Sequence, residues 1–278
     1  MVDIDRAITF LKTQDRPVEL AWARYTAGQG PADEIVTALE RYQNADCGFG
    51  NNLEVDIHAP DSQAFAARLA MHVLTDAGVP ADHPMVTKLA GWLEREQGED
   101  GDWRFPSGVY EHQLAPWFQG WTFPSPNPSL SVAGAAKRLG IGSPRMFERV
   151  DALIAQHGNV SDAESGNFYE VLPYAEYFPW SDHPERERFI DAIARGIAAR
   201  AETGGYEDAG HFFEHAGGPD SLVSQRLPRV LIDAQLDRLE AEQAQDGGWP
   251  SPYDPRWRPW TTAAALSTLR AYGRLPLS

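Results

Sequence analysis

The chain has 278 residues, of which 24 are lysine or arginine and 40 are aspartate or glutamate, so its formal net charge is −16. This excess of negative charge argues against a protein that binds nucleic-acid phosphates or docks on a membrane through a basic patch. Hydrophobic residues make up 42% of the sequence, which is enough for a substantial core and excludes a chain that is disordered throughout.

The single cysteine, Cys47, cannot form an intrachain disulfide. The N-terminal residues lack the basic and apolar regions of a secretory signal. No stretch approaches the roughly 18 uninterrupted apolar residues of a membrane-spanning helix. The sequence therefore predicts a cytoplasmic protein with no transmembrane segment and no nucleic-acid partner, and it is compatible with a homo-oligomer.

Apolar residues recur with helical spacing along most of the chain, whereas the alternating runs typical of strands are scarce. In chain order, the helical runs cover residues 4–11, 35–42, 65–73, 86–93, 190–197 and 266–272. The charged segment 182–188 carries acidic residues where a helix would begin, and we interpret it as a solvated helix face. The pattern predicts an all-α fold whose long connections contain proline and glycine.

A seven-residue motif follows three of the predicted helices. It begins with glutamine, has aspartate three positions later and ends with an aromatic residue, as residues 43–49 (QNADCGF), 97–103 (QGEDGDW) and 243–249 (QAQDGGW). The gap between the second and third copies is about three times the first spacing, so two degenerate copies are expected between them. The best candidates are residues 165–168 (SGNF) and 203–206 (TGGY).

The chemistry of one repeat can be read from its residues. Glycine allows a positive φ where a helix ends and the chain reverses. The aspartate can accept hydrogen bonds from nearby backbone N–H groups, and the aromatic ring supplies a large apolar anchor. A helical hairpin cannot bury its apolar face alone, so neighbouring hairpins are expected to stack.

The motif resembles the QW repeat of the squalene–hopene cyclase and protein prenyltransferase β-subunit superfamily, over residues 30–275. The resemblance implies an α/α toroid (barrel) of five or six helical hairpins with QxxDGGW-type turns. Residues 1–278 would form a single domain, with inner helices around a central aromatic cavity. The superfamily includes terpene cyclases, prenyltransferase subunits and binding domains, so the fold alone does not select the function.

Class II cyclases of this superfamily protonate an alkene with an aspartate of a DxDD box near the start of an inner helix. The sequence has no DxDD, and the nearest match is residues 61–64 (DSQA). The resemblance therefore implies Asp61 as the acid, with Asp56 or Glu54 as the carboxyl group that tunes its pKa. The alternative for Asp61 is a helix cap, because Asp-Ser-Gln is ordinary N-capping chemistry. The prenyltransferase zinc segment and the DDxxD metal box of class I enzymes are absent.

Residues 211–215 read His-Phe-Phe-Glu-His, the H-x-x-E-H string of some zinc peptidases. There, two histidines bind the metal and the glutamate acts as a base. Here His211, Glu214 and His215 would be the metal ligands or an acid–base group. A further ligand would come from elsewhere in the chain, such as Asp208, Asp220 or Glu240. Glycines flank the string closely, and a polar loop is the alternative. No other cofactor is expected.

Aromatic residues gather in three parts of the chain, interleaved with proline. They could line an apolar cavity or stabilise a cation, and the alternative for most of them is packing. The candidate substrate-binding residues are Trp103, Trp117, Trp121, Tyr169, Tyr174, Tyr206, Trp249 and Trp257. Three carboxylates near these clusters, those of Asp102, Glu170 and Glu176, are further candidate acids, because burial among aromatic rings would raise their pKa.

Three functional hypotheses follow. The first is a terpenoid-cyclase-like enzyme that binds an apolar, isoprenoid small molecule in a central aromatic cavity and uses carboxylic-acid catalysis. The second is a toroid that binds an apolar ligand without chemistry. The third is a metal-dependent or carbohydrate-active hydrolase that uses the H-x-x-E-H segment.

Overall fold

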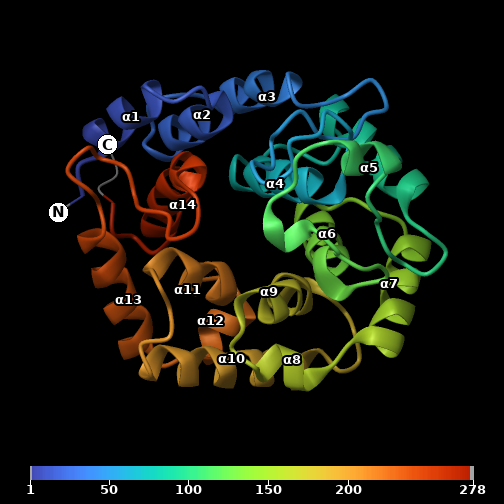
Figure 1. Cartoon of the computed structure of the whole chain (residues 1–278). Helices are drawn as coiled ribbons and strands as arrows, with labels where there is room; N and C mark the ends of the chain where they lie inside the picture. The colour runs from blue at the N-terminus through green and yellow to red at the C-terminus, as the bar shows by residue number, and fades with distance from the viewer. Residues whose placement is uncertain (1, 276–278) are drawn as a thin grey trace. The chain divides into compact units, whose positions relative to one another are not determined.

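The protein is described by a computed structural model that covers residues 2–275. Within this range the fold is all-α, as predicted: it has fourteen α-helices, four short 3-10 helices, two isolated β-bridges and no strand (Figure 1). The α-helices are α1 (Ile4–Lys12), α2 (Pro17–Thr26), α3 (Ala32–Glu40), α4 (Ala64–Asp76), α5 (Pro84–Glu96), α6 (Pro126–Leu139), α7 (Pro144–His157), α8 (Val160–Glu164), α9 (Phe168–Tyr177), α10 (Arg186–Glu202), α11 (Ala209–Ala216), α12 (Leu222–Arg226), α13 (Arg229–Ala241) and α14 (Arg258–Ala271). The 3-10 helices are η1 (Ser107–Glu111), η2 (Pro116–Phe118), η3 (Phe178–Trp180) and η4 (Pro255–Trp257).

Each run of helical periodicity overlaps a helix, namely α1, α3, α4, α5, α10 and α14, although the runs 35–42 and 266–272 extend past the last residues of α3 and α14. The charged segment 182–188 leads into α10, which begins at Arg186 and carries Glu187 in its first turn. Over residues 2–275, no helix is both long enough and apolar enough to cross a membrane.

The chain divides into two compact units. The first comprises the described residues up to Ala38, Ser161–Val171 and the described residues from Glu187 onward. The second comprises Leu39–Val160 and Leu172–Arg186. The prediction of a single domain stays a prediction.

In the first unit, α14 packs against α2 and α1, and α11 packs against α13 and α14. The rings of Trp22 and Trp260 meet at the α2–α14 contact, with centroids 5.1 Å apart. The N-terminal helix and the C-terminal helix therefore share one core, as the blue and red ribbons of Figure 1 show.

In the second unit, α4 packs against α6, and α6 also contacts α7. Close approach depends on small residues: a Cβ atom on Gly134 of α6 would lie 2.2 Å from the carbonyl oxygen of Glu176. The alanines of α4 are buried, as expected for helices that approach closely.

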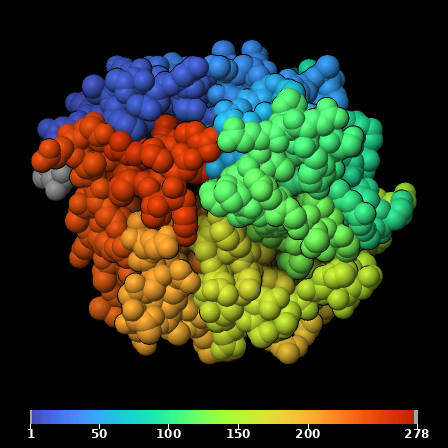
Figure 2. Space-filling model, in the orientation of Figure 1, coloured from blue at the N-terminus to red at the C-terminus, as the bar shows by residue number. Residues whose placement is uncertain are grey.

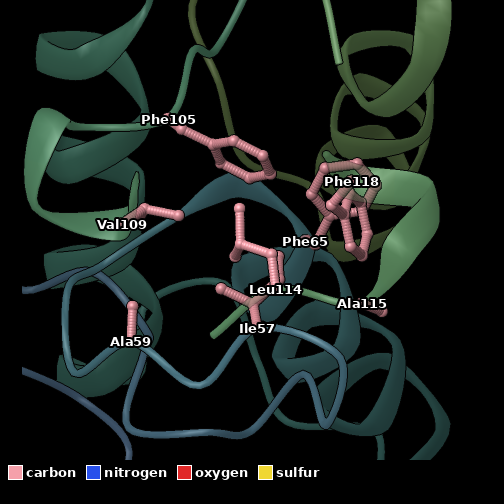
Figure 3. Packing of buried hydrophobic residues seen from close by; sticks show 8 residues of the cluster. All are labelled: Ile57, Ala59, Phe65, Phe105, Val109, Leu114, Ala115 and Phe118. Carbon is pink, nitrogen blue, oxygen red and sulfur yellow. The ribbon is translucent and has the colours of Figure 1, made fainter. Parts of the chain in front are cut away.

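An apolar cluster in the second unit joins the loop before α4 to the loop that carries η1 and η2 (Figure 3). Phe65 of α4 is at its centre, with Phe118 and Phe105 at centroid distances of 4.8 and 5.7 Å. The partly buried Trp121 packs edge-on against Phe65 at 5.6 Å. These rings fill the space between the loops by packing against one another.

The three motif copies fold into the same turn. In each copy the aspartate carboxylate accepts a hydrogen bond from the backbone N–H two residues later, as predicted. The bonds are Asp46–Gly48 (3.0 Å), Asp100–Asp102 (3.4 Å) and Asp246–Gly248 (3.1 Å). The residue after the aspartate has a positive φ of 77° at Cys47, 84° at Gly101 and 95° at Gly247. The turn is therefore set by local chemistry, and a cysteine takes the glycine position in the first copy.

The glutamine side chain of each copy forms hydrogen bonds within its own turn and to the start of another helix. Its side-chain Nε2 donates both to the carbonyl four residues later and to a carbonyl at the beginning of α5, α7 or α1. The distant acceptors are Met85 (3.2 Å) for Gln43, Met146 (3.1 Å) for Gln97 and Asp3 (2.9 Å) for Gln243. The last motif of the chain is thereby joined to the first helix, within the first unit.

The two motif tryptophans anchor their turns to the preceding helix. The indole N–H of Trp103 donates to the Leu93 carbonyl at 2.9 Å, and that of Trp249 donates to the Leu239 carbonyl at 2.7 Å. The two tryptophans are 1% and 2% exposed. The aromatic end of the motif is therefore a packing anchor, as expected from its chemistry.

The degenerate copies also form turns, at Gly166 (φ 74°) and Gly204 (φ 68°). They lack the motif glutamine, and arginines from later helices bind their carbonyls instead. Arg200 of α10 donates to the Gly166 carbonyl, and Arg238 of α13 donates to the Tyr206 carbonyl at 3.0 Å. A turn with a positive-φ glycine therefore lies at each expected position, between α8 and α9 and between α10 and α11, and an arginine donates where the motif has glutamine.

Candidate active site

Asp208 and His211 form a preorganised pair at the start of α11. Asp208 caps the helix: its Oδ1 accepts the backbone N–H of His211 at 2.8 Å, and its Oδ2 lies 2.7 Å from the ring Nδ1 of the same residue. The two side chains are 10% and 13% exposed. Because a carboxylate only accepts, Nδ1 of His211 carries the proton, and in the neutral ring Nε2 is the basic nitrogen.

Aromatic rings from two other segments of the first unit surround His211. Phe168, at the start of α9, packs edge-on against it with centroids 4.7 Å apart. Tyr253, in the loop before α14, stands perpendicular to it at 5.3 Å. Tyr169 packs edge-on against Phe168 at 5.1 Å. In the space-filling view, the orange surface around α11 adjoins the red surface of the C-terminal segment (Figure 2).

The electrostatic environment favours a protonated His211. Burial opposes the charge on the ring, but the hydrogen bond to Asp208 and the charges of Glu214, Asp208 and Glu207 outweigh it and raise the pKa of His211. The Tyr253 hydroxyl donates to Glu207, and burial together with this carboxylate raises the pKa of that phenol. The pKa of His211 is therefore higher than that of an ordinary histidine, so its Nε2 is a stronger base, which suits a group that accepts and returns a proton.

His215, one turn further along α11, is buried and hydrogen-bonded within the protein, so its role is structural. It is 1% exposed. Its Nε2 lies 3.0 Å from the Phe168 carbonyl, and its Nδ1 lies 2.8 Å from the Tyr206 hydroxyl. A carbonyl only accepts, so Nε2 carries the proton and Tyr206 donates to Nδ1. Burial lowers the pKa of His215 to about 3, so the ring is neutral.

This geometry does not fit the predicted metal ligands. His211, Glu214 and His215 share α11, but both ring nitrogens of His215 are engaged in internal hydrogen bonds. No cluster of three His, Cys, Asp or Glu side chains suited to a metal ion occurs in the part of the chain that the structure describes. The two histidines of the H-x-x-E-H string therefore have different roles. His211 contacts the aromatic rings of the site, and His215 stacks on one of them, Phe168, at a centroid distance of 4.9 Å.

The predicted acid and its partners lie in the second unit, in the loop before α4. Glu54 and Asp56 are both 4% exposed, and the Asp56 backbone N–H donates to Glu54 Oε1 at 3.2 Å. Asp61 is half-buried, and its carboxylate lies against Gly108 of η1. Asp61 is not the helix cap: Gln63 caps α4 by accepting the Ala66 N–H at 3.1 Å. The cap lies two residues later because the chain is still extended at Gln63.

The predicted substrate-binding aromatics separate into two groups. Trp103, Tyr174, Tyr206 and Trp249 are at most 3% exposed and hydrogen-bonded within the protein, which leaves almost no ring surface for a ligand. Trp117, Trp121, Tyr169 and Trp257 retain exposed surface. Of these four, only Tyr169 belongs to the rings that surround His211.

Among the further candidate acids, Asp102 has the expected raised pKa, because burial outweighs its hydrogen bonds. Its carboxylate accepts the backbone N–H of Ser125 at 2.9 Å and that of Trp103 at 2.7 Å, together with the Ser129 hydroxyl. These bonds fix the turn to the chain that enters α6, so the role of Asp102 is structural.

Phe168 and Tyr253 belong to the predicted aromatic clusters but were not among the candidate substrate-binding residues. Glu207 was not predicted, and Asp208 was considered only as a metal ligand. One local signal points to Asp208: an aspartate three residues before a histidine, at the start of a short helix, can cap the helix and hold the ring. No comparable signal marks Phe168 or Tyr253, which lie more than 40 positions from His211.

No family profile matches the chain, and none of the curated proteins compared with it matches. One solved structure, a crystal structure of a protein from Actinoplanes, is similar over 97% of this chain and 98% of that chain, with a TM-score of 0.58 and 15% sequence identity. Similarity at this identity shows a shared fold and carries no information about the reaction.

Proposed function

We propose that the protein is an acid–base enzyme with the α/α toroid fold of the squalene–hopene cyclase and prenyltransferase superfamily, acting on a small molecule with an apolar, isoprenoid-like body. His211 accepts and returns the proton, and Asp208 positions its ring. Phe168, Tyr169 and Tyr253 supply the apolar surface beside it.

The Asp208–His211 pair carries this proposal. A carboxylate that binds both the backbone N–H and the ring Nδ1 of one histidine fixes the tautomer and the direction of Nε2. When Nε2 takes a proton from the substrate, the imidazolium lies beside the charges of Asp208, Glu207 and Glu214, which stabilise it. A positioned histidine of this kind typically accelerates a proton transfer by about 10²–10⁴-fold.

The toroid part of the proposal rests on the repeats. Three turns with the same hydrogen bonds and two degenerate turns recur along the chain, with two or three α-helices between successive turns. The Gln243–Asp3 contact joins the last motif to the first helix in the way that Gln43 and Gln97 join their motifs to later helices. A closed array of hairpins requires a link of this kind.

Turnover of a panel of neutral isoprenoids and their amine analogues in D₂O tests the function. Product mass and deuterium content report proton transfer. We expect a product that contains solvent deuterium, and we expect His211→Asn to slow its formation by at least about 100-fold, the lower range for general acid–base catalysis.

Asp61→Asn serves as the matched comparison, because Asp61 is the acid that the superfamily resemblance implies. Full activity of Asp61→Asn with loss of activity in His211→Asn supports the present assignment. The opposite result contradicts it and restores the cyclase mechanism at Asp61. Saturable ligand binding without product from any member of the panel contradicts the enzymatic proposal and favours the binding-protein alternative.

A further inference from the structure

The surface around His211 combines aromatic rings with carboxylates. Four rings stand edge to face in the order Tyr169, Phe168, His211 and Tyr253, each about perpendicular to the next. Tyr169 is 43% exposed and Tyr253 is 46% exposed, so parts of both rings are open to a ligand. Tyr169 is among the groups that raise the pKa of Tyr253, after burial and Glu207.

The charges on this surface are negative. The charges that act most strongly on His211 come from Glu214, Asp208 and Glu207. Arg238 is engaged with other acceptors: it donates to the Tyr206 and Glu207 carbonyls and pairs with Glu242 at 2.7 Å. The rings therefore lie in a negative electrostatic field.

This combination selects among ligand classes. A diphosphate or carboxylate would be repelled by the three acidic side chains whose charges act on His211. Two interactions favour the binding of a positively charged amine: its attraction to the faces of aromatic rings and its attraction to the nearby carboxylates. A neutral apolar group gains only from contact with the rings.

We propose that this surface binds an organic cation, a protonated or quaternary amine attached to an apolar body. The ammonium group lies between the Tyr169 and Tyr253 rings, and the carboxylates of Glu207 and Glu214 supply the opposite charge. The inference rests on the proposed function for its role in a reaction, and it names the substrate class of that site as an amine.

The test is a titration of the whole protein with choline and with 3,3-dimethylbutan-1-ol, its uncharged analogue of the same shape. Binding is followed at low ionic strength by calorimetry and by the NMR signals of the His211 ring. We expect choline to bind at least about tenfold more tightly than the alcohol, which corresponds to about 1.4 kcal/mol. Inorganic pyrophosphate should not displace choline.

Three variants locate the site. Glu207→Gln and Tyr253→Leu should each weaken choline binding severalfold. Glu207→Gln, which removes only a charge, should affect binding of the uncharged alcohol much less. Asp33→Asn removes the same unit of charge from an exposed position on α3 and should leave the affinity for choline unchanged. Equal affinities for choline and the alcohol, tighter binding of pyrophosphate, or equal effects of Glu207→Gln and Asp33→Asn would each overturn the inference.

Failure of this inference and failure of the proposed function give different results. If choline does not bind but His211→Asn abolishes turnover of a neutral isoprenoid, the amine class is wrong and the acid–base role stands. If choline binds as expected but His211→Asn keeps full turnover, the surface is an amine-binding site and the acid–base role is wrong.

Discussion

Lowering the pH from 7.5 to 5.0 should destabilise the folded protein through His215. Burial lowers the pKa of His215 to about 3 in the folded chain, whereas a histidine in an unfolded chain titrates near 6.5. Between these values the unfolded chain binds a proton that the folded chain does not. The stability that depends on the neutral ring is therefore complete above about pH 6.5 and is lost as the pH falls toward 3.

The size of the effect follows from the two pKa values. At pH 5.0, protonation stabilises an unfolded histidine by about 2 kcal/mol, against less than about 0.1 kcal/mol at pH 7.5. His215→Gln removes this group. The difference in unfolding free energy between the parent protein and His215→Gln should therefore shrink by about 2 kcal/mol between pH 7.5 and pH 5.0.

Urea unfolding followed by tryptophan fluorescence at the two pH values measures this difference. Two other histidines also make the unfolding free energy depend on pH. The pKa of His211 is raised, so acidification changes the stability in the opposite direction to the effect of His215. Burial lowers the pKa of His72, so its effect has the same direction as that of His215. Both remain in the two proteins, so their contributions cancel in the comparison. His112→Gln is the control, because its ring is exposed, and it should lose the same stability as the parent. The reasoning is refuted if His215→Gln also loses as much stability as the parent on acidification.

Asp208→Asn should lower the pKa of His211 measured by NMR, because it removes the charge that holds the ring, and an unchanged pKa would contradict the pairing. Gly101→Ala should destabilise by more than about 2 kcal/mol, since a Cβ there would lie 2.2 Å from a carbonyl oxygen of α7 in addition to the strain of φ 84°. Gly78→Ala has φ 65° and open space, so chemical denaturation should show a loss of only about 1 kcal/mol, and equal losses would argue against the close contact. Gln243→Leu should cost about 1–3 kcal/mol, because its amide makes hydrogen bonds to both its own turn and the chain that enters α1; a neutral result would show that water replaces them.

The sequence by itself determined six of the helices and the three motif turns. Apolar periodicity acts within one helix, and a motif of seven residues contains its own aspartate acceptor, its positive-φ position and its aromatic anchor. These features depend on neighbours along the chain, so α1, α4 and α10 and the turns at Gly101 and Gly247 could be predicted without tertiary contacts. The raised pKa of Asp102 was predictable because it directly precedes the motif tryptophan, and burial beside such an aromatic residue disfavours the charged carboxylate.

Only the tertiary structure decided what the chemical groups do. His211 and His215 belong to one sequence string, but His215 is bound by the Phe168 carbonyl 47 positions earlier, and His211 meets Tyr253 more than 40 positions later. Contacts between residues so far apart in the chain produce no recognisable pattern in the sequence. The side chain of His215 was therefore equally compatible with a metal ligand and with a buried neutral ring until packing brought Phe168 against it and closed both of its nitrogens.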